Sequence, residues 1–260
     1  MSMLEVRTVT QRYGVSEVLR DIDLQVRAGE SVALVGPSGC GKTTLLNLCA
    51  GLLPPTTGGI NSGFERTACV FQQPRLLPWK SALDNIALGL KALGTPAGER
   101  ARHARELALR MGLAGDDLDK YPHQLSGGMQ SRIALARAFA VAPDLLLLDE
   151  PFSALDIGLK AELHALLLEY ATTRRTAVLM VTHDLMEAVR LSQRILLMSA
   201  PEHAPGRIVW QVEFDRPFAR RDDAWVYHNT AQLLATAQVR HAFSLAPVAS
   251  PDTGGLYRAA

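Results

Sequence analysis

The sequence predicts an α/β domain in which a parallel β-sheet carries helices on both faces. Apolar runs such as Leu145–Leu148 and Ala177–Val181 alternate with stretches of helical periodicity, as in chains built from βαβ units. A glycine-rich loop, Gly36–Thr43, joins one such run to a helical stretch. Residues 1–30 instead alternate apolar and polar positions, which predicts short antiparallel strands beside the main sheet.

The first part of the sheet is expected around the glycine-rich loop. Ser31–Val35 is predicted to be a buried strand, and Thr44–Leu53 a helix that ends before Pro54-Pro55. Residues 56–63 are rich in glycine and threonine, which favours a loop. Thr67–Phe71 is predicted to be the next strand.

Residues 82–141 are expected to be mostly helical. Glu99–Leu113 has apolar residues at helical spacing, and its arginine and histidine side chains are expected to face solvent. Gly128–Val141 is predicted to be a second helix, which ends before Pro143. The apolar positions of the first helix are Ala104, Leu107, Ala108 and Met111.

The carboxyl-terminal half continues the alternation and then loses it. Beyond Asp215 the pattern weakens, with a helix expected over Ala231–Val239 and frayed chain over residues 248–260. We therefore expect one domain over residues 1–214, with a helical part at about residues 80–142, and a carboxyl-terminal extension of unknown role over residues 215–260. Before that point the patterns predict strands over Leu145–Asp149, Thr176–Thr182, Ile195–Met198 and Ile208–Phe214, and helices over Ile157–Thr173 and Asp184–Ser192.

Composition excludes several classes of protein. The 27 lysines and arginines nearly balance 26 aspartates and glutamates, so the net charge of +1 gives no indication of a nucleic-acid partner. The three cysteines, Cys40, Cys49 and Cys69, are odd in number and lack C-x-x-C spacing, which favours a reducing cytosol over a disulfide framework or a zinc site. No secretion signal is expected at the amino terminus, and no apolar run reaches the roughly 18 residues of a membrane span. A role at a membrane is therefore expected to come through a partner.

The glycine-rich loop fits the phosphate-binding motif G-x-x-x-x-G-K-[ST], in the strand-to-helix setting that the motif needs. Its glycines let backbone N–H groups turn inward around a phosphate, and the helix start adds partial positive charge. Lys42 is expected to reach the β- and γ-phosphates of a nucleotide, and the Thr43 hydroxyl to coordinate Mg²⁺. The alternative, a glycine-rich turn with no ligand, fits this setting less well. The residues expected to bind nucleotide here are Gly36, Pro37, Ser38, Gly39, Cys40, Gly41, Lys42, Thr43 and Thr44.

Two acids end a run of four leucines, at Asp149 and Glu150. In an open parallel sheet, ligands bind at the carboxyl edge of the strands, where Asp149 is expected to lie. Asp149 is predicted to hold Mg²⁺, and Glu150 to orient or deprotonate the attacking water. The alternative is a strand end whose acids only face solvent.

A second potential phosphate site precedes the helix at Gly128–Val141. Ser126 is a good N-cap, and this structural role is expected whatever the function. The sequence Ser126-Gly127-Gly128 also exposes backbone N–H groups and a hydroxyl to an anion. One nucleotide needs only one phosphate loop, so this second helix start needs its own explanation.

With these motifs the sequence resembles the nucleotide-binding subunit of ABC transporters, over roughly residues 4–214. Leu125–Gln130 is similar to that family's signature sequence. The resemblance implies a P-loop NTPase fold with a RecA-like parallel-sheet core, a small antiparallel β-subdomain and a helical subdomain. It further implies ATP and Mg²⁺ as ligands, and ATP hydrolysis as the activity.

The resemblance assigns roles to further residues. Tyr13 is similar to the aromatic residue that stacks on adenine, although it also fits an ordinary strand aromatic. Gln72, preferred over Gln73 because it follows Val70-Phe71, is similar to the glutamine that senses Mg²⁺ and the membrane partner. Ser153–Asp156 resembles the D-loop. His183 resembles the switch histidine that contacts the γ-phosphate; without its place after a strand it would be read as structural.

The segment Phe71–Trp79 resembles importers of nitrate, sulfonates, taurine and similar small solutes, which work with a solute-binding protein. Leu76, Leu77 and Trp79 then form a docking surface for the permease, or otherwise a local hydrophobic cluster. The resemblance implies a peripheral subunit on the cytoplasmic side of the inner membrane. The alternatives are an ATPase for export or envelope remodelling, a soluble ABC ATPase outside transport, and a P-loop kinase, against which the signature sequence argues.

The family's mechanism explains the second phosphate site. Two subunits close head to tail, so that Lys42 of one and Ser126 of the other grip the same ATP. Catalysis is then expected from positioning and charge stabilisation by Lys42, Mg²⁺ and His183, with Glu150 acting on the water.

Overall fold

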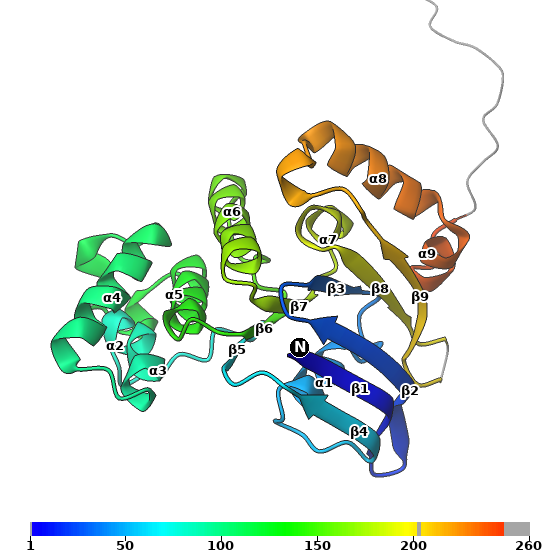
Figure 1. Cartoon of the computed structure of the whole chain (residues 1–260), viewed down its shortest axis with the longest axis horizontal. Helices are drawn as coiled ribbons and strands as arrows, with labels where there is room; N and C mark the ends of the chain where they lie inside the picture. The colour runs from blue at the N-terminus through cyan, green and yellow to red at the C-terminus, as the bar shows by residue number, and fades with distance from the viewer. Residues whose placement is uncertain (1, 202–203, 247–260) are drawn as a thin grey trace, which may run out of the picture.

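The computed structural model of the chain describes residues 2–201 and 204–246 (Figure 1). The expectation of frayed chain at residues 248–260 falls outside these residues. Within them, every helix is too short or too polar to cross a lipid bilayer.

The main sheet confirms the predicted parallel core. Its strand order is β5-β6-β7-β3-β8-β9, and all neighbours are parallel except β9, which pairs antiparallel with β8. Strands β3, β6 and β7 are buried along their whole length, as expected for strands covered on both faces. The strands span Ser31–Val35 (β3), Thr67–Val70 (β5), Leu145–Asp149 (β6), Ala177–Val181 (β7), Arg194–Ser199 (β8) and Arg207–Glu213 (β9).

Two hydrophobic cores lie on opposite faces of this sheet, because successive strand residues point to opposite sides. In β6, Leu145 and Leu147 belong to one core, and Leu146 and Leu148 to the other. The first core is closed by helix α1 and the antiparallel sheet, and the second by the remaining long helices (Figure 1). Because both faces are filled, the open positions of the sheet are its strand ends.

A small antiparallel sheet has the order β2-β1-β4, formed by Met3–Tyr13 (β1), Ser16–Arg27 (β2) and Thr57–Ser62 (β4). The expected loop at residues 56–63 is therefore wrong, because β4 pairs with β1 from Leu4 to Thr10. One of its glycines is required by the close approach of β1, because a Cβ at Gly58 would lie 2.4 Å from the Thr8 carbonyl oxygen.

Helix α1 spans Lys42–Cys49, so it begins and ends earlier than the expected Thr44–Leu53. The end is set by Gly51, whose φ of 69° is left-handed and whose N–H bonds to the Leu48 carbonyl. This glycine, rather than the proline pair after it, ends the helix.

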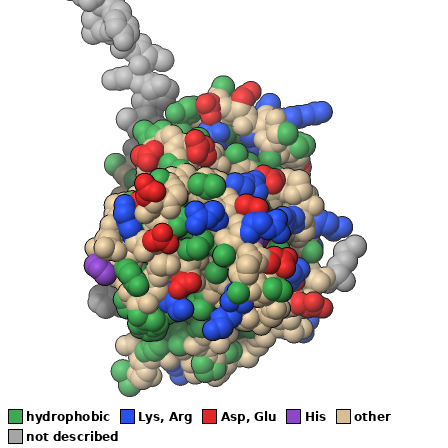
Figure 2. Space-filling view, turned by 90° about the vertical axis from the view of Figure 1, so that its left-hand side faces the viewer, with side chains coloured by type: hydrophobic (Ala, Val, Ile, Leu, Met, Phe, Trp, Pro, Cys, Tyr) green, Lys and Arg blue, Asp and Glu red, His purple; other side chains and the backbone are tan. Residues whose placement is uncertain are grey.

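The helical part confirms the mostly helical prediction for residues 82–141 (Figure 1, left). In α4, the predicted apolar positions Ala104, Leu107, Ala108 and Met111 are all buried, and Arg102, Arg105 and Arg110 are exposed. Figure 2 shows acidic and basic side chains interspersed on this side of the molecule. The helices are Ala82–Ile86 (α2), Leu88–Ala92 (α3), Ala97–Arg110 (α4) and Gly127–Ala140 (α5).

The remaining helices are Ile157–Thr173 (α6), Leu185–Leu191 (α7), Asp223–Ala235 (α8) and Ala237–Ala242 (α9). The single helix expected over Ala231–Val239 is wrong, because Thr236 is extended with ψ of 132° and separates α8 from α9. Short 3₁₀ turns lie at Gly115–Asp117, Pro122–Gln124 and Phe218–Arg220.

The carboxyl-terminal segment is fastened to α7 by the buried guanidinium of Arg221. This group donates to the carbonyl oxygens of Val189 at 2.7 Å and Ser192 at 2.6 Å, at the end of α7. It also stacks on Phe218, 4.6 Å from the ring centroid, and burial lowers its pKa to about 10. Arg190 of α7 adds an ion pair with Asp223 at 2.6 Å.

We expect Arg221→Met to lower the free energy of unfolding by about 2–4 kcal/mol, because it leaves the carbonyls at the end of α7 without their donor. The measurement is urea denaturation followed by circular dichroism. Arg220→Met changes the adjacent, exposed arginine and is the matched control, with an expected effect within about 0.5 kcal/mol. Equal effects of the two substitutions would contradict the capping role of Arg221.

Candidate functional site

The glycine-rich loop links the end of β3 to the start of α1 and has no room for larger residues at two positions. A Cβ at Gly36 would lie 2.2 Å from the Met198 carbonyl oxygen on β8. Gly41, the N-cap of α1, has φ of 97°, and a Cβ there would lie 2.5 Å from the Leu19 side chain. The loop is thus held tightly between β2 and β8.

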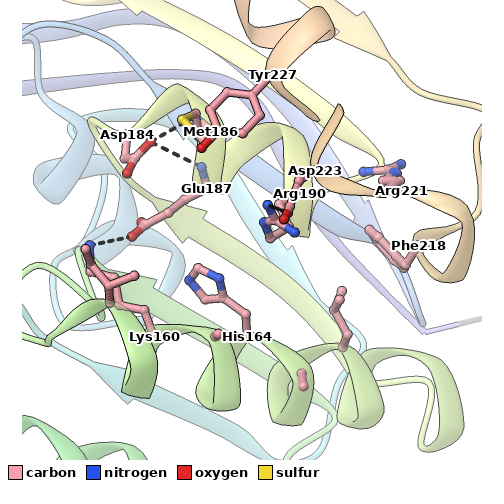
Figure 3. Close-up of a pocket in the computed structure, with 14 residues that line it drawn as sticks. Lys160, His164, Asp184, Met186, Glu187, Arg190, Phe218, Arg221, Asp223 and Tyr227 are labelled. Atoms are coloured by element: carbon pink, nitrogen blue, oxygen red, sulfur yellow. Dashed lines mark hydrogen bonds and ion pairs between the residues drawn. The ribbon is translucent and has the colours of Figure 1, made fainter. Parts of the chain in front are cut away.

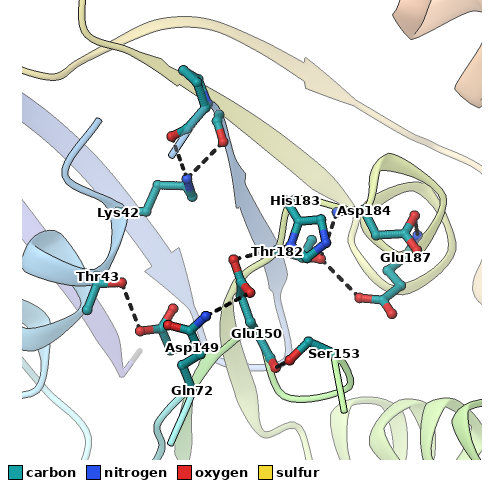
Figure 4. Close-up of polar contacts among 12 residues, drawn as sticks. Lys42, Thr43, Gln72, Asp149, Glu150, Ser153, Thr182, His183, Asp184 and Glu187 are labelled. Carbon is teal, nitrogen blue, oxygen red and sulfur yellow. Dashed lines mark hydrogen bonds and ion pairs between the residues drawn. The ribbon is translucent and has the colours of Figure 1, made fainter. Parts of the chain in front are cut away.

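Lys42 is buried at the first position of α1, with 8% of its surface exposed. Its ammonium group donates to the carbonyl oxygens of Gly36 and Pro37, each at 2.8 Å (Figure 4). The charge is therefore held across the loop, where the backbone N–H groups of a helix start already favour an anion.

A cavity of about 290 Å³ opens in front of the loop. Gln72 and Glu150 line it together with the phosphate loop, although they come from the ends of β5 and β6. The structure thus brings together residues that are far apart in sequence. The lining residues are Val18, Ser38, Gly39, Gly41, Lys42, Thr43, Thr44, Gln72, Glu150 and Val181.

Asp149 ends β6 and is almost fully buried beside Thr43. The Thr43 hydroxyl donates to its carboxylate at 2.9 Å (Figure 4). Burial raises the pKa of the carboxyl group, and the Thr43 hydrogen bond partly opposes this shift. A hydroxyl and a carboxylate side by side are oxygen ligands of the kind Mg²⁺ prefers, so these residues fit such an ion. Within the described residues there is no cluster of three or more His, Cys, Asp or Glu that could hold a metal without other ligands.

Glu150 contacts polar side chains from two neighbouring strand ends at this edge (Figure 4). Its carboxylate accepts from Gln72 Nε2 at 3.3 Å and lies 3.2 Å from His183 Nδ1. Its backbone has a left-handed φ of 47°, and its N–H bonds to the Val181 carbonyl at 2.9 Å. Such a backbone is uncommon outside glycine and is found preferentially at functional sites.

His183 follows β7 and keeps 65% of its side chain exposed while facing Glu150. Thr182, directly before it, belongs to a hydrogen-bond network that was not predicted from the sequence. Thr182 donates to Glu187 at 3.0 Å, and Lys160 donates to the same carboxylate at 3.0 Å. In the sequence, the only indication of this network is Glu187, an acidic residue within the short helix predicted over Asp184–Ser192.

Ser126 has the structural role expected of it. Its hydroxyl accepts from the Met129 N–H at 3.3 Å as the N-cap of α5, with Gly127 and Gly128 next to it. These residues do not line the cavity of the phosphate loop, since α5 belongs to the helical part and α1 lies across the main sheet (Figure 1). Within one chain the two predicted phosphate sites are thus separate.

Tyr13 and Trp79 are both exposed, by 49% and 70%. Tyr13 ends β1 at the hairpin, where it pairs with Ser16, and it does not line the cavity. In the predicted docking segment, Leu76 packs against the core, and Asn85 holds the Leu77 backbone through its N–H at 2.8 Å and its carbonyl at 3.2 Å. Trp79 is thus the large apolar side chain of this segment that is exposed to solvent.

A second cavity, of about 560 Å³, lies between α6, α7 and the carboxyl-terminal segment (Figure 3). His164 lines it, and its Nε2 is buried without a partner among the described residues. Burial, together with the charges of Arg190 and Lys160, lowers the pKa of His164 to about 4, so the ring is neutral at pH 7.

A phosphate-binding loop, a buried Asp–Thr pair and a carboxylate poised at the strand ends define a P-loop ATPase. The profile of the ABC transporter family matches residues 19–153. The chain is 47% identical over 220 residues to the aliphatic sulfonates import ATP-binding protein SsuB 3 of Paraburkholderia xenovorans (strain LB400), covering 84% of each chain. It belongs to the ABC transporter family, as an ATP-binding subunit that hydrolyses ATP.

Two further comparisons agree with this membership. The taurine import ATP-binding protein TauB of Escherichia coli O157:H7 is 41% identical over 227 residues, which are 84% of this chain and 86% of the relative. A dimeric structure of MJ0796, a bacterial ABC transporter cassette, superposes with a TM-score of 0.75 at 29% identity, over 82% of this chain and all of that one. The predicted fold class is thereby confirmed.

The neutral His164 predicts a pH dependence of stability. Because its pKa is about 4 in the folded chain against an ordinary 6.5, the unfolded chain binds the proton more readily, and stability falls as the pH drops from about 6.5 to about 4. We expect His164→Gln to remove about 1–3 kcal/mol of this loss, measured by urea denaturation at both pH values. His228→Gln, at an exposed histidine, is the control. An unchanged acid profile in His164→Gln would contradict the assignment.

Proposed function

We propose that the chain powers the import of a small sulfonate-, taurine- or nitrate-like solute, as the peripheral ATPase on the cytoplasmic side of the inner membrane. The names of its relatives, which are import ATP-binding proteins for aliphatic sulfonates and taurine, support this substrate class. The segment Phe71–Trp79 supports it independently, by its resemblance to this group of importers. A permease and a solute-binding protein complete the proposed transporter.

The observation that supports the mechanism is that the two predicted phosphate sites lie apart within one chain. The cavity at Lys42 lacks the N-cap of α5, and Ser126 is exposed on another part of the molecule. Two chains placed head to tail would bring each Ser126 to the other chain's Lys42. A solved relative described as the dimeric post-hydrolysis state of an ATP-binding cassette, with ADP and Pi, supports this arrangement.

In the proposed reaction each residue has one task. Lys42 and the loop amides hold the β- and γ-phosphates, and Tyr13 stacks on the adenine. Thr43 and Asp149 would hold Mg²⁺, with Gln72 beside them; the ion would neutralise charge on the phosphates. Glu150 orients the attacking water and takes up its proton, and His183 stabilises the γ-phosphate from the other side.

Transport requires that the closure of two chains around ATP be transmitted to the permease in the membrane. Gln72 lies at the cavity and bonds to Glu150, while Trp79, seven residues on, is exposed. We assign residues 72–79 as the path from the nucleotide to the permease, with Trp79 as its apolar contact.

We expect Lys42→Ala to weaken ATP binding by about 10–100-fold, because a buried charged donor is lost. Glu150→Gln should bind ATP as tightly as the parent while its turnover falls by about 10²–10⁴-fold. Binding is measured by calorimetry and turnover by phosphate release without an acceptor, which also excludes a kinase. Parental turnover in Glu150→Gln would show that Glu150 is not the base.

The same Glu150→Gln protein tests the dimer, because it holds ATP without consuming it. Light scattering is expected to give twice the chain mass with ATP and a single mass without it. Ser126→Glu, which adds a negative charge beside the shared phosphate, should keep it monomeric. ATP-saturated Glu150→Gln that remains a monomer would contradict the shared site.

Trp79→Ala tests the proposed partner and solute together. Cells that depend on this chain for growth on taurine or an alkanesulfonate as sulfur source should grow poorly with Trp79→Ala, and less permease should co-purify from solubilised membranes. ATP hydrolysis by the isolated variant should remain within about twofold, since Trp79 lies outside the cavity. Leu109→Ala, at an exposed leucine of α4, is the control. Normal growth and permease recovery with Trp79→Ala would remove the docking role.

A further inference from the structure

The carboxylate of Glu187 is buried in α7, and both of its oxygens have partners. Oε1 accepts from Lys160 Nζ at 3.0 Å (Figure 3), and Oε2 accepts from the Thr182 hydroxyl at 3.0 Å (Figure 4). Only 7% of the Glu187 side chain is exposed, so the carboxylate is largely shielded from water and depends on these two partners for its hydrogen bonds. Replacing a buried ion pair by apolar side chains often changes the free energy of unfolding little. The pair of Lys160 and Glu187 therefore points to a role in fixing local geometry more than in adding stability.

The geometry concerned is the turn that carries His183. Thr182 comes directly before the histidine, and its hydroxyl also accepts from the Asp184 N–H at 3.0 Å. Asp184, directly after it, accepts from the N–H groups of Met186 at 2.8 Å and Glu187 at 3.2 Å. Both neighbours of His183 are thus held by side-chain hydrogen bonds, whereas the imidazole itself is mostly exposed.

Lys160 connects this turn to a second loop. It lies one turn into α6, the helix that Asp156 begins by accepting from the Leu159 N–H at 3.0 Å. The preceding residues, Ser153–Asp156, form the D-loop of the sequence analysis, and Ser153 donates to the Glu150 carbonyl at 3.0 Å. Figure 3 shows Lys160 of α6 reaching across to Glu187 of α7. One carboxylate therefore joins the helix after the D-loop to the turn of His183.

We propose that Glu187 is a positioning residue for ATP hydrolysis. It acts through Thr182 to place the His183 imidazole against Glu150, and through Lys160 to make that placement depend on α6. The inference rests on the proposed role of His183 at the γ-phosphate. Because the D-loop continues into α6, a shift of that loop on closure of the two chains moves the anchor of the histidine as well.

The test is a double-mutant cycle between Glu187→Gln and His183→Ala, with kcat and KM for ATP measured in all four proteins. Glu187→Gln keeps the shape of the side chain but loses the charge that Lys160 requires. We expect kcat to fall by roughly 10–100-fold, as for a misplaced catalytic group, and KM to change less than twofold. In the His183→Ala background the same substitution should change kcat less than twofold.

Controls separate positioning from general damage. Arg190→Gln breaks the ion pair of α7 with the exposed Asp223, on the same helix but away from the turn, and should leave kcat within twofold. Thr182→Val keeps the shape of the threonine, removes its hydrogen bonds to Glu187 and from the Asp184 N–H, and should reproduce the kcat loss. It decides the question if Glu187→Gln does not fold, as judged by thermal unfolding.

A second readout does not use turnover. Diethyl pyrocarbonate should modify His183 several-fold faster in Glu187→Gln and Thr182→Val than in the parent or Arg190→Gln, as followed by peptide mass spectrometry. If His183→Ala keeps parental kcat, the proposed role of His183 fails; faster modification would then still support the positional link. The inference itself is overturned if Glu187→Gln and Thr182→Val keep parental kcat and modification rate. It is also overturned if Glu187→Gln lowers kcat equally with and without His183.

Discussion

The constraint on which the site depends is the burial of the main sheet on both faces. Strands β3, β6 and β7 are fully buried, so polar side chains can reach a ligand only from their ends. Because these strands are parallel neighbours, their carboxyl ends meet at one edge. That edge collects the phosphate loop after β3, Asp149 and Glu150 at the end of β6, and His183 after β7.

At this edge the polar residues are ordered around one carboxylate rather than spread along a groove. Glu150 contacts Gln72, which follows β5, and His183, which follows β7. Its backbone is left-handed, a conformation that is costly for residues other than glycine, and its side chain faces both Gln72 and His183. The residues proposed to sense the membrane partner and the γ-phosphate thus both contact the residue proposed to act on the water.

Much of this could be predicted from the sequence, since apolar runs and the loop Gly36–Thr43 are local patterns. The errors also have local causes. Glycine usually indicates a loop, but at Thr57–Ser62 it lies in a strand, where close contact with β1 requires Gly58. Gly51, rather than the prolines after it, ends α1. The bond between Lys160 and Glu187 joins residues that are 27 positions apart and belong to different helices, so no spacing rule indicates it. The roles of Tyr13, Ser126 and the other proposed site residues remain predictions.

The close contact behind Gly36 has a consequence for how the loop recognises its ligand. The atom opposite it is the Met198 carbonyl oxygen, which belongs to the main chain of a neighbouring strand and cannot rotate aside as a side chain would. The rear wall of the loop is therefore rigid, and its amides are already arranged before any anion arrives. Little conformational entropy is then lost on binding, so the loop is preorganised for the phosphates.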